Sequence, residues 1–420
     1  MSRSAVAVVG AGVSGLTAAY LLQRSYDVTL LEAGPRLGGH AHTHDVPATD
    51  GGTLPVDTGF IVHNERTYPN LLRLFRELSV TTKDSDMSMS VRCEGCGLEY
   101  AGARGLRGIF AQPRALTRPA YLRLLAEVKK FHVQARRVLV SAETEGLTLG
   151  GFLAAGGYSR FFATHFLLPL VSAVWSSGTI TAQRYPARYL FRFLDNHGML
   201  RVTGSPQWKT VVGGSRTYVE RAAKELSAVH VCTPVRSLRR TSEGVEIRDD
   251  ADTAYSFDRV VIATHPDQAL ELLADPTPAE RQVLGAIPYS RNPAVFHTDS
   301  ALLPSCPGAK ASWNYLLTSC EPADDRAVAS YDLNRLHQIA EPREYVVTLG
   351  AADRVSTDAV IARMAYDHPV YTPESLGAQG RLPELTTGVT AYAGAYHGWG
   401  FHEDGCASGV RAAAAFGVAW

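Results

Sequence analysis

The chain has 420 residues, 41 Lys and Arg balanced by 41 Asp and Glu, and a hydrophobic fraction of 45%. This balance excludes an intrinsically disordered chain and offers no basic surplus for nucleic-acid binding. The length corresponds to two or three domains. Six cysteines are too few for a disulfide scaffold, so we expect a cytoplasmic protein. The N-terminus shows no signal-peptide pattern, and the near-apolar stretch 161–175 is shorter than the ~18–20 residues of a membrane span, which predicts a buried helix.

The first thirty residues predict a β-α-β unit. A buried strand over 5–9 precedes a helix over 13–24, and a second buried strand follows over 28–31. Further strands are expected over 229–231, 259–263 and 389–393, and a small-residue helix over about 406–415. We therefore expect an α/β protein with a Rossmann-like nucleotide-binding domain that is interrupted by a second, α+β domain.

The segments between these strands differ in composition. Residues 76–204 are rich in Leu, Arg and aromatic residues at helical spacing, and residues 290–384 mix short strands with Pro-containing loops. We assign the nucleotide-binding domain to 1–75, 205–289 and 385–420. The substrate domain then comprises 76–204 and 290–384.

A glycine-rich turn follows the first predicted strand. Gly10, Gly12 and Gly15 match G-x-G-x-x-G, in which they provide a tight turn, room for a pyrophosphate and close helix packing, respectively. The helix that follows would direct unpaired N–H groups at the phosphates. Glu32 ends the second strand about twenty residues later, where a carboxylate accepts hydrogen bonds from an adenosine ribose. The turn therefore predicts a dinucleotide site.

The residues after Glu32 resemble a flavoprotein motif. The stretch Glu-Ala-Gly-Pro-Arg-Leu-Gly-Gly over 32–39 is similar to the E-A-x-x-R-x-G-G stretch of the group that includes amine oxidases, protoporphyrinogen oxidase and phytoene-type desaturases. Residues 56–60, 392–394 and 403–409 resemble later motifs of that group. With 60–70, 195–198, 207–215 and 400–405, the chain resembles a bacterial subfamily of FAD-binding amine-oxidase-like proteins, often encoded near cyclopropane-fatty-acid synthase-like methyltransferases.

This resemblance implies an amine oxidase/glutathione-reductase-like fold that binds FAD non-covalently. It places Val235 at the adenine through its backbone and Asp404 at the ribitol, while Cys406 packs in the helix-opening motif instead of attaching to flavin. The cofactor contacts it implies are Gly10, Gly12, Ser14, Gly15, Glu32, Ala33, Arg36, Gly38, Gly39, His40, Thr58, Gly59, Phe60, Ile61, Val235, Gly394, Glu403, Asp404, Gly405 and Cys406.

The catalytic candidates lie between the last strand and the helix that would face the flavin: Tyr396, His397, Trp399 and His402. His397 or His402 could accept a proton at neutral pH, although the more common role of such a histidine is to bond to backbone. One aromatic of the amine oxidases' substrate cage corresponds to Ala391, with Tyr392 and Tyr396 as possible substitutes. This departure argues against amine oxidation.

We expect an FAD-dependent oxidoreductase that oxidises, desaturates or isomerises a hydrophobic, fatty-acyl-like substrate by hydride transfer to flavin N5. The alternatives are an amine oxidase for a small or natural-product amine, and a flavin-binding partner protein without turnover. Because the chain has no second G-x-G-x-x-G, we expect oxygen or an external acceptor to reoxidise the flavin.

Two further segments stand out. Residues 103–140 carry nine basic side chains against Glu127, and Tyr121, Leu125, Val128, His132, Ala135 and Leu139 predict an amphipathic helix there. This segment is either an ordinary solvated face or a peripheral contact for anionic lipid. Cys93 and Cys96 form a C-x-x-C without a second pair at zinc-site spacing, so we interpret them as a structural turn and expect no metal site.

Overall fold

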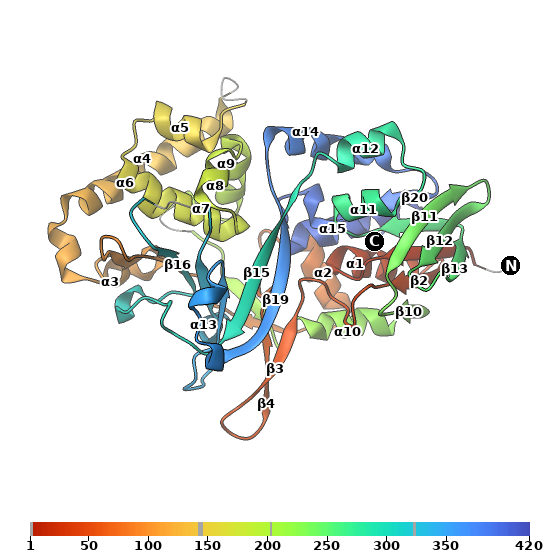
Figure 1. Ribbon diagram of the computed structural model, residues 1–420, viewed down its shortest axis with the longest axis horizontal. Coiled ribbons are helices and arrows are strands. Elements are labelled where there is room, and N and C mark those ends of the chain that lie inside the picture. The colour runs from red at the N-terminus through yellow and green to blue at the C-terminus, as the bar shows by residue number, and fades with distance from the viewer. Residues whose placement is uncertain (1–2, 142–145, 202–203, 322–324) are drawn as a thin grey trace.

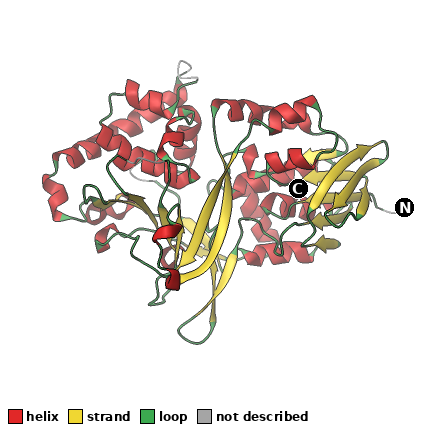
Figure 2. Ribbon diagram, viewed as in Figure 1, coloured by secondary structure: helices red, strands yellow, loops and turns green. Residues whose placement is uncertain are grey.

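The computed structural model describes residues 3–141, 146–201, 204–321 and 325–420. Figure 1 shows two lobes, one containing α1, α15 and β10–β13 and the other containing α3–α9. The long strands β15 (Tyr289–His297) and β19 (Val360–Pro369) run between the lobes. Figure 2 shows that helices predominate in the outer part of the second lobe, whereas strands lie at its inner side.

A five-stranded parallel sheet forms the first lobe. Its order is β10 (Ala228–His230), β2 (Asp27–Leu31), β1 (Ala5–Val9), β14 (Arg259–Ile262) and β20 (Thr390–Tyr392). Side chains alternate across it, so that Val6 and Val8 face one core cluster and Ala7 and Val9 face another. The first cluster includes residues of α1 (Val13–Leu22), α2 (Pro69–Glu77), α10 (Arg216–Lys224) and α15 (His402–Ala415).

The second cluster packs the other face of this sheet. It contains residues of the antiparallel strands β11 (Val235–Thr241) and β12 (Gly244–Asp249), and of helices α11 (Pro266–Leu272), α12 (Pro278–Leu284) and α14 (Pro373–Arg381). Strand β13 (Ala254–Phe257) pairs with β12. Helices therefore cover one face of the parallel sheet, and a mixture of strands and helices covers the other.

The predicted strands of this sheet agree with the structure to within one residue at each end. The last helix differs, because it begins at His402 and not near 406. The Asp404 carboxylate accepts a hydrogen bond from the Phe401 N–H at 2.9 Å, which satisfies a free donor in the first turn. The helix therefore starts earlier than its small-residue pattern indicates.

A seven-stranded sheet forms the inner side of the second lobe. Its order is β19, β15, β18 (Val346–Leu349), β17 (Ala329–Asp332), β16 (Trp313–Leu317), β7 (Met89–Cys93) and β8 (Glu99–Ala101). Only β16 and β7 pair in parallel. The helices of this lobe are α3 (Gly105–Ile109), α4 (Pro119–Val140), α5 (Leu149–Ala155), α6 (Arg160–Phe162), α7 (Leu168–Trp175), α8 (Thr179–Gln183) and α9 (Ala187–Asn196).

Short connecting sheets join the two lobes. Strands β3 (Thr43–Pro47) and β4 (Thr53–Asp57) form a hairpin, and β9 (Trp208–Val211) pairs with both β5 (Val62–Asn64) and β6 (Thr82–Asp84). This second sheet spans the expected domain boundary at residue 76. The division of the chain into two discontinuous domains stays a prediction.

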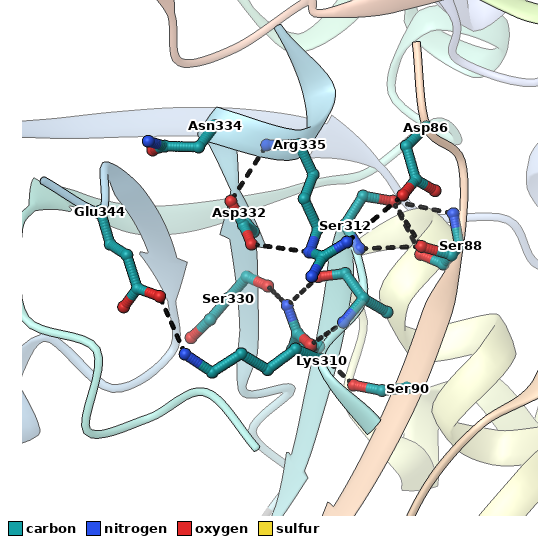
Figure 3. Close-up of polar contacts among 12 residues, drawn as sticks. Asp86, Ser88, Ser90, Lys310, Ser312, Ser330, Asp332, Asn334, Arg335 and Glu344 are labelled. Atoms are coloured by element: carbon teal, nitrogen blue, oxygen red, sulfur yellow. Dashed lines mark hydrogen bonds and ion pairs between the residues drawn. The ribbon is translucent and has the colours of Figure 1, made fainter. Parts of the chain in front are cut away.

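A buried polar network fixes how β7 lies beside β16. The Ser88 N–H donates to Ser312 Oγ at 2.8 Å, and the Ser312 N–H donates to Ser88 Oγ at 3.0 Å (Figure 3). The Ser90 hydroxyl donates to Asn314 Oδ1 at 2.8 Å. Because a buried polar group without a partner is costly, these bonds favour one register, in which Cys93 pairs with Leu317.

The basic segment 103–140 contains the expected helix, α4, but the predicted buried face was partly wrong. Tyr121 and Ala135 are buried as expected, whereas Leu125, Val128, His132 and Leu139 are only half-buried. The core instead receives Leu124, Glu127, Phe131 and Val138. Buried Glu127 accepts bonds from the Ser159 N–H and hydroxyl and pairs with Arg123, and this fixes the rotation of the helix.

The near-apolar stretch 161–175 forms the expected buried helix. It is not uniform, because a π-helical turn over Ala163–Leu167 separates α6 from α7. Within the part of the chain that the structure describes, no helix combines the length and the apolar character needed to cross a membrane.

Candidate active site

A cavity of about 630 Å³ lies between the two large sheets. On one side it is bounded by the residues that follow the carboxyl ends of β1, β2, β14 and β20, which is where open α/β sheets bind ligands. On the other side it is bounded by Trp313 on β16, Tyr331 on β17, Val347 on β18 and Tyr366 on β19. Helix α7 contributes Trp175.

The glycine turn after β1 leaves space for a ligand. Gly10 has a φ of +99°, which favours glycine, and a Cβ at Gly15 would lie 1.9 Å from the Gly10 carbonyl oxygen. These two positions therefore build the turn. At Gly12, by contrast, a Cβ would meet no atom within 4 Å, and the residue lines the cavity. The open volume above Gly12, next to the start of α1, suits a pyrophosphate.

Glu32 stands at the rim of the cavity, held by two backbone bonds. Its Oε2 accepts a hydrogen bond from the Ala11 N–H and its Oε1 accepts one from the Gly34 N–H, each at 2.8 Å. A carboxylate has about four lone-pair positions, so both oxygens can still accept from ribose hydroxyls. Val235 also lines the cavity, and it follows Thr233, whose N–H donates to the Glu32 carbonyl oxygen at 2.8 Å. This end fits an adenosine.

Most of the expected cofactor residues line this cavity: Gly10, Gly12, Ser14, Glu32, Ala33, Gly39, His40, Thr58, Gly59, Phe60, Ile61, Val235 and Gly394. The others do not reach its surface: Gly15, Arg36, Gly38, Glu403, Asp404, Gly405 and Cys406. Two of them bond to residues that do: Arg36 to Gly39 and Asp404 to Phe401. The assignment of individual cofactor contacts stays a prediction.

Three of these residues have clear structural partners. The Arg36 guanidinium donates to the Gly39 carbonyl at 2.7 Å and so stabilises the segment that contains Gly38 and Gly39. Glu403 accepts bonds from the Asn70 and Leu71 N–H groups at the start of α2. The Cys406 sulfur is buried against the Thr17 hydroxyl, 3.5 Å away and outside the cavity.

Among the catalytic candidates, Tyr396, Trp399 and His402 line the cavity and His397 does not. His402 stacks on Phe60, with ring centroids 3.7 Å apart, and its Nε2 lies 2.8 Å from the Tyr218 hydroxyl. Burial lowers the pKa of His402 to about 3, so the ring is neutral at physiological pH. A neutral ring with so low a pKa is better suited to positioning a bound molecule than to abstracting a proton from it.

Tyr396 and Trp399 offer hydrogen-bond donors to the cavity. The Tyr396 hydroxyl and the Trp399 indole N–H are buried, and neither has a hydrogen-bond partner among the described residues. Because such donors are costly when unsatisfied, a bound molecule is the natural acceptor. His397 is half-buried, and this burial lowers its pKa to about 3.

Sequence reasoning missed a second group of rings on β19. Tyr366 and His368 both line the cavity with His40, whose ring centroid lies 5.2 Å from that of Tyr366 and 5.4 Å from that of His368. Burial lowers the pKa of His368 to about 4, so this cluster is uncharged. The spacing of two residues, which places Tyr366 and His368 on one face of a strand, was the available signal.

The end of the cavity formed by the second lobe is apolar. It is lined by Trp175, Phe193, Met199, Trp313, Tyr331, Val347 and Leu349. No Lys or Arg among the described residues lines the cavity. On β19, the acidic residue Asp367 lines the cavity, and its buried Oδ1 has no hydrogen-bond partner among the described residues.

A smaller cavity of about 450 Å³ adjoins the first and shares Tyr68, Trp399 and Phe401 with it. Asp404 lines this smaller cavity. Burial raises the pKa of Asp404 from 3.8 to about 7, and the bond from the Phe401 N–H only partly offsets it.

We expect Asp404→Asn to change how stability depends on pH. A carboxyl whose pKa is higher in the folded state stabilises the fold at low pH, and that contribution is lost as pH rises from about 4 to 7. The full shift corresponds to about 4 kcal/mol. Urea unfolding of the wild type and the variant at pH 4, 6 and 8 should show the variant gaining relative stability as pH rises. The exposed Glu243→Gln should show no such trend, and parallel pH curves for Asp404→Asn and the wild type would refute the expectation.

Known proteins are similar to this chain in sequence. The sequence profile of the family described as flavin-containing amine oxidoreductase matches residues 13–298. A carotenoid phi-ring synthase of Streptomyces griseus is 38% identical over 109 residues, which are 26% of this chain and 20% of the synthase. A coproporphyrinogen III oxidase of Mycobacterium leprae (strain TN) is 25% identical over 300 residues, 66% of this chain and 63% of the oxidase. The chain thus spans less than two thirds of either relative.

Solved structures confirm the expected fold. Cyclohexylamine oxidase from Brevibacterium oxydans IH-35A superposes with a TM-score of 0.70 at 17% identity, covering 99% of this chain and 98% of that one. A fatty acid isomerase from P. acnes that produces CLA superposes with a TM-score of 0.69 at 16% identity, covering 97% of both chains. At these identities the likeness concerns the fold alone.

Proposed function

Because this chain belongs to the family of flavin-containing amine oxidoreductases, we propose that it is an FAD-dependent oxidoreductase acting on a hydrophobic substrate. The observation that carries the proposal is the apolar end of the cavity, where Trp175, Trp313 and Leu349 form the wall and no described Lys or Arg is present. Such a wall favours an uncharged, fatty-acyl-like portion of a substrate over a small polar one.

One end of the cavity would bind the cofactor, and the other end would bind the substrate. The turn at Gly12 and the carboxylate of Glu32 would hold the pyrophosphate and ribose of FAD, which supplies a hydride acceptor when bound. The aromatic wall would exclude water from the substrate carbon. Tyr396 and Trp399 would orient a polar group through the donors that have no described partner. Oxygen or an external acceptor would then take the electrons.

The test is to add candidate substrates anaerobically to the purified yellow protein and to follow the visible flavin absorbance. We expect fatty-acyl lipids to bleach it, followed by recovery on admission of oxygen or an artificial acceptor. Bleaching by small polar amines alone would overturn the hydrophobic assignment. Flavin that stays oxidised with every donor, while acyl double bonds also remain unchanged, would favour a non-catalytic flavin-binding partner.

Amine oxidation remains the second candidate because of one observation. Asp367 brings a carboxylate oxygen without a described partner to the cavity, where it could bind an ammonium group. Of the two tyrosines that might replace the missing cage aromatic, Tyr396 lines the cavity. The Tyr392 hydroxyl instead donates to Glu280 at 2.6 Å, away from the cavity. Hydrogen peroxide release with a panel of amines would support this candidate.

We also propose that the basic segment 103–140 contacts anionic lipid at a membrane surface, which would give the enzyme access to acyl chains. Leu106, Leu116 and Leu122 are 75%, 55% and 42% exposed in this segment, among exposed arginines. Each basic residue adds about 1 kcal/mol near an anionic surface. We expect the protein to sediment with phosphatidylserine-containing vesicles and not with phosphatidylcholine vesicles. Leu106→Asp/Leu116→Asp should abolish binding and Ile361→Asp, on β19, should preserve it; equal binding to both vesicles would refute the proposal.

A further inference from the structure

Four metal-binding side chains from three distant segments meet at the outer end of the seven-stranded sheet. Cys93 is the last residue of β7, and Cys96 lies in the turn that leads to β8. His165 lies in the π-helical turn before α7, and Cys320 follows β16. One ligand atom from each residue lies within 4.8 Å of the other three. Cys93 and His165 are buried, and Cys96 and Cys320 are half-buried.

Two distances within this cluster match those of a tetrahedral metal centre. Zn–S bonds of about 2.3 Å and a Zn–N bond of about 2.0–2.1 Å place two sulfurs about 3.8 Å apart and a sulfur and a nitrogen about 3.5 Å apart. The Sγ atoms of Cys93 and Cys320 are 3.7 Å apart, and Cys96 Sγ is 3.5 Å from His165 Nε2. A disulfide would need about 2.05 Å between its sulfurs. We propose that Cys93, Cys96, Cys320 and His165 form a Zn²⁺ site.

The turn between β7 and β8 is shaped to present two thiolates. The backbone N–H groups of Cys96 and Leu98 face the sulfurs of Cys93 and Cys96, respectively. Gly97 has a φ of +68°. A Cβ at Gly95 would lie 2.8 Å from the Cys320 nitrogen, so glycine there lets the third cysteine approach.

His165 is oriented by bonds on its other ring nitrogen. Its Nδ1 lies 2.8 Å from the Thr164 hydroxyl and 3.2 Å from the Phe161 carbonyl oxygen. A proton on Nδ1 that is donated to the carbonyl leaves Nε2 with a free lone pair directed at the cysteines, as zinc-binding histidines require. The π-helical turn, a feature often found at functional sites, places this ring inside the cluster.

A neighbouring cation balances the charge of the centre. Three thiolates and one Zn²⁺ carry a net charge of −1. The Arg118 guanidinium donates to the Cys96 carbonyl oxygen at 3.2 Å and lies over the Phe161 ring, 5.4 Å from its centroid. It therefore lies beside the cluster, where its positive charge would offset the net negative charge of the centre.

This arrangement explains why the sequence alone indicated a simple turn. Cys96 and His165 are 69 residues apart, and Cys93 and Cys320 are 227 apart, far beyond the spacing of compact zinc motifs. Parallel pairing of β7 with β16 sets Cys93 opposite Leu317, and the Glu94 N–H donates to the Leu317 carbonyl at 2.8 Å. Only this register brings Cys320 beside the turn.

The site is structural in character. Four protein ligands leave no open position for substrate or water, as in structural zinc centres. The ion would join the β7–β8 turn, the end of β16 and the π-helical turn. Since β16 carries Trp313 and α7 carries Trp175, it would also stabilise the elements that form the apolar wall of the large cavity.

The decisive experiment measures metal in the wild-type protein, purified with a reductant and without chelators. Inductively coupled plasma mass spectrometry should find about one zinc per chain. Replacement by Co²⁺ should give the visible absorption of tetrahedral cobalt–thiolate. His165→Ala and Cys320→Ser should lose the metal, His165→Cys should retain it, and Cys306→Ser should behave as wild type because the Cys306 sulfur bonds to the Ala111 carbonyl outside the cluster.

Several results would overturn the proposal. One is wild-type protein that holds no zinc even after incubation with excess Zn²⁺ and gives no cobalt spectrum. Others are a Cys93–Cys320 disulfide in freshly purified protein, or iron and inorganic sulfide in place of zinc. Because these measurements use the wild type, they do not depend on whether the ligand variants fold. They are also independent of the flavin, so a failure here is distinguishable from a failure of the proposed oxidoreductase activity.

Discussion

Replacing Gly12 with valine is expected to give a folded protein that purifies without flavin. A Cβ at Gly12 meets no protein atom within 4 Å, so the side chain should not disturb the turn or α1. It would instead fill the volume proposed for the pyrophosphate, where glycine allows close backbone approach. We expect FAD to bind at least about 100-fold more weakly, which corresponds to about 2.7 kcal/mol. The measurement is the flavin content after purification, followed by an FAD titration.

The control is the same substitution at an open glycine elsewhere. A Cβ at Gly377 in α14 also meets no atom within 4 Å, and the residue lies outside the cavity. Gly377→Val should therefore keep its flavin. Circular dichroism and thermal unfolding of flavin-free protein should establish that Gly12→Val is folded. A yellow Gly12→Val protein with wild-type FAD affinity would show that the pyrophosphate lies elsewhere.

Replacing Glu280 with alanine is expected to lower the free energy of unfolding by about 3–5 kcal/mol, the range for breaking a buried ion pair. The Glu280 side chain is 2% exposed and is bonded by both terminal nitrogens of Arg240, at 2.6 and 3.0 Å. It also accepts bonds from the Tyr392 hydroxyl and the Thr277 N–H. The substitution would leave the Arg240 charge without this partner. It would also remove the hydrogen bond to Tyr392 on β20, the strand that leads to the cavity residues at 394–402.

The pH dependence of this loss has a defined sign. Burial alone would raise the pKa of Glu280, but the bonds from Arg240, Tyr392 and Thr277 outweigh it and lower the pKa to about 2. A depressed pKa stabilises the fold above the unfolded value, and the contribution is lost as pH falls from about 4.5 toward 2. Urea unfolding should therefore show the largest difference between Glu280→Ala and the wild type at neutral pH.

A partly exposed ion pair provides the matched control for this variant. Glu246 and Arg248 are 2.9 Å apart and each is 39% exposed, so Glu246→Ala should cost less than about 1 kcal/mol. If the two alanine variants lost equal amounts of unfolding free energy, burial would not be the reason for the effect at Glu280.

The sequence by itself determined the nucleotide-binding half of the fold and the location of its glycine turn. A tight turn between a strand and a helix requires glycine at fixed positions, so Gly10, Gly12 and Gly15 identify it locally. The strands of the parallel sheet were equally clear, because buried parallel strands appear as short continuous apolar runs. These signals depend on neighbours in the chain, which a sequence displays directly.

The tertiary structure decided which side chains face the cavity and which residues meet across the chain. Tyr396 lines the cavity and His397 does not, because a 3₁₀ turn over Ala395–His397 directs adjacent side chains differently. The aromatic wall comes from strands and helices far apart in sequence, and Cys93 meets Cys320 only through the pairing of β7 with β16. Such contacts depend on sheet order and register, which the buried polar bonds at Ser88 and Ser312 help to select.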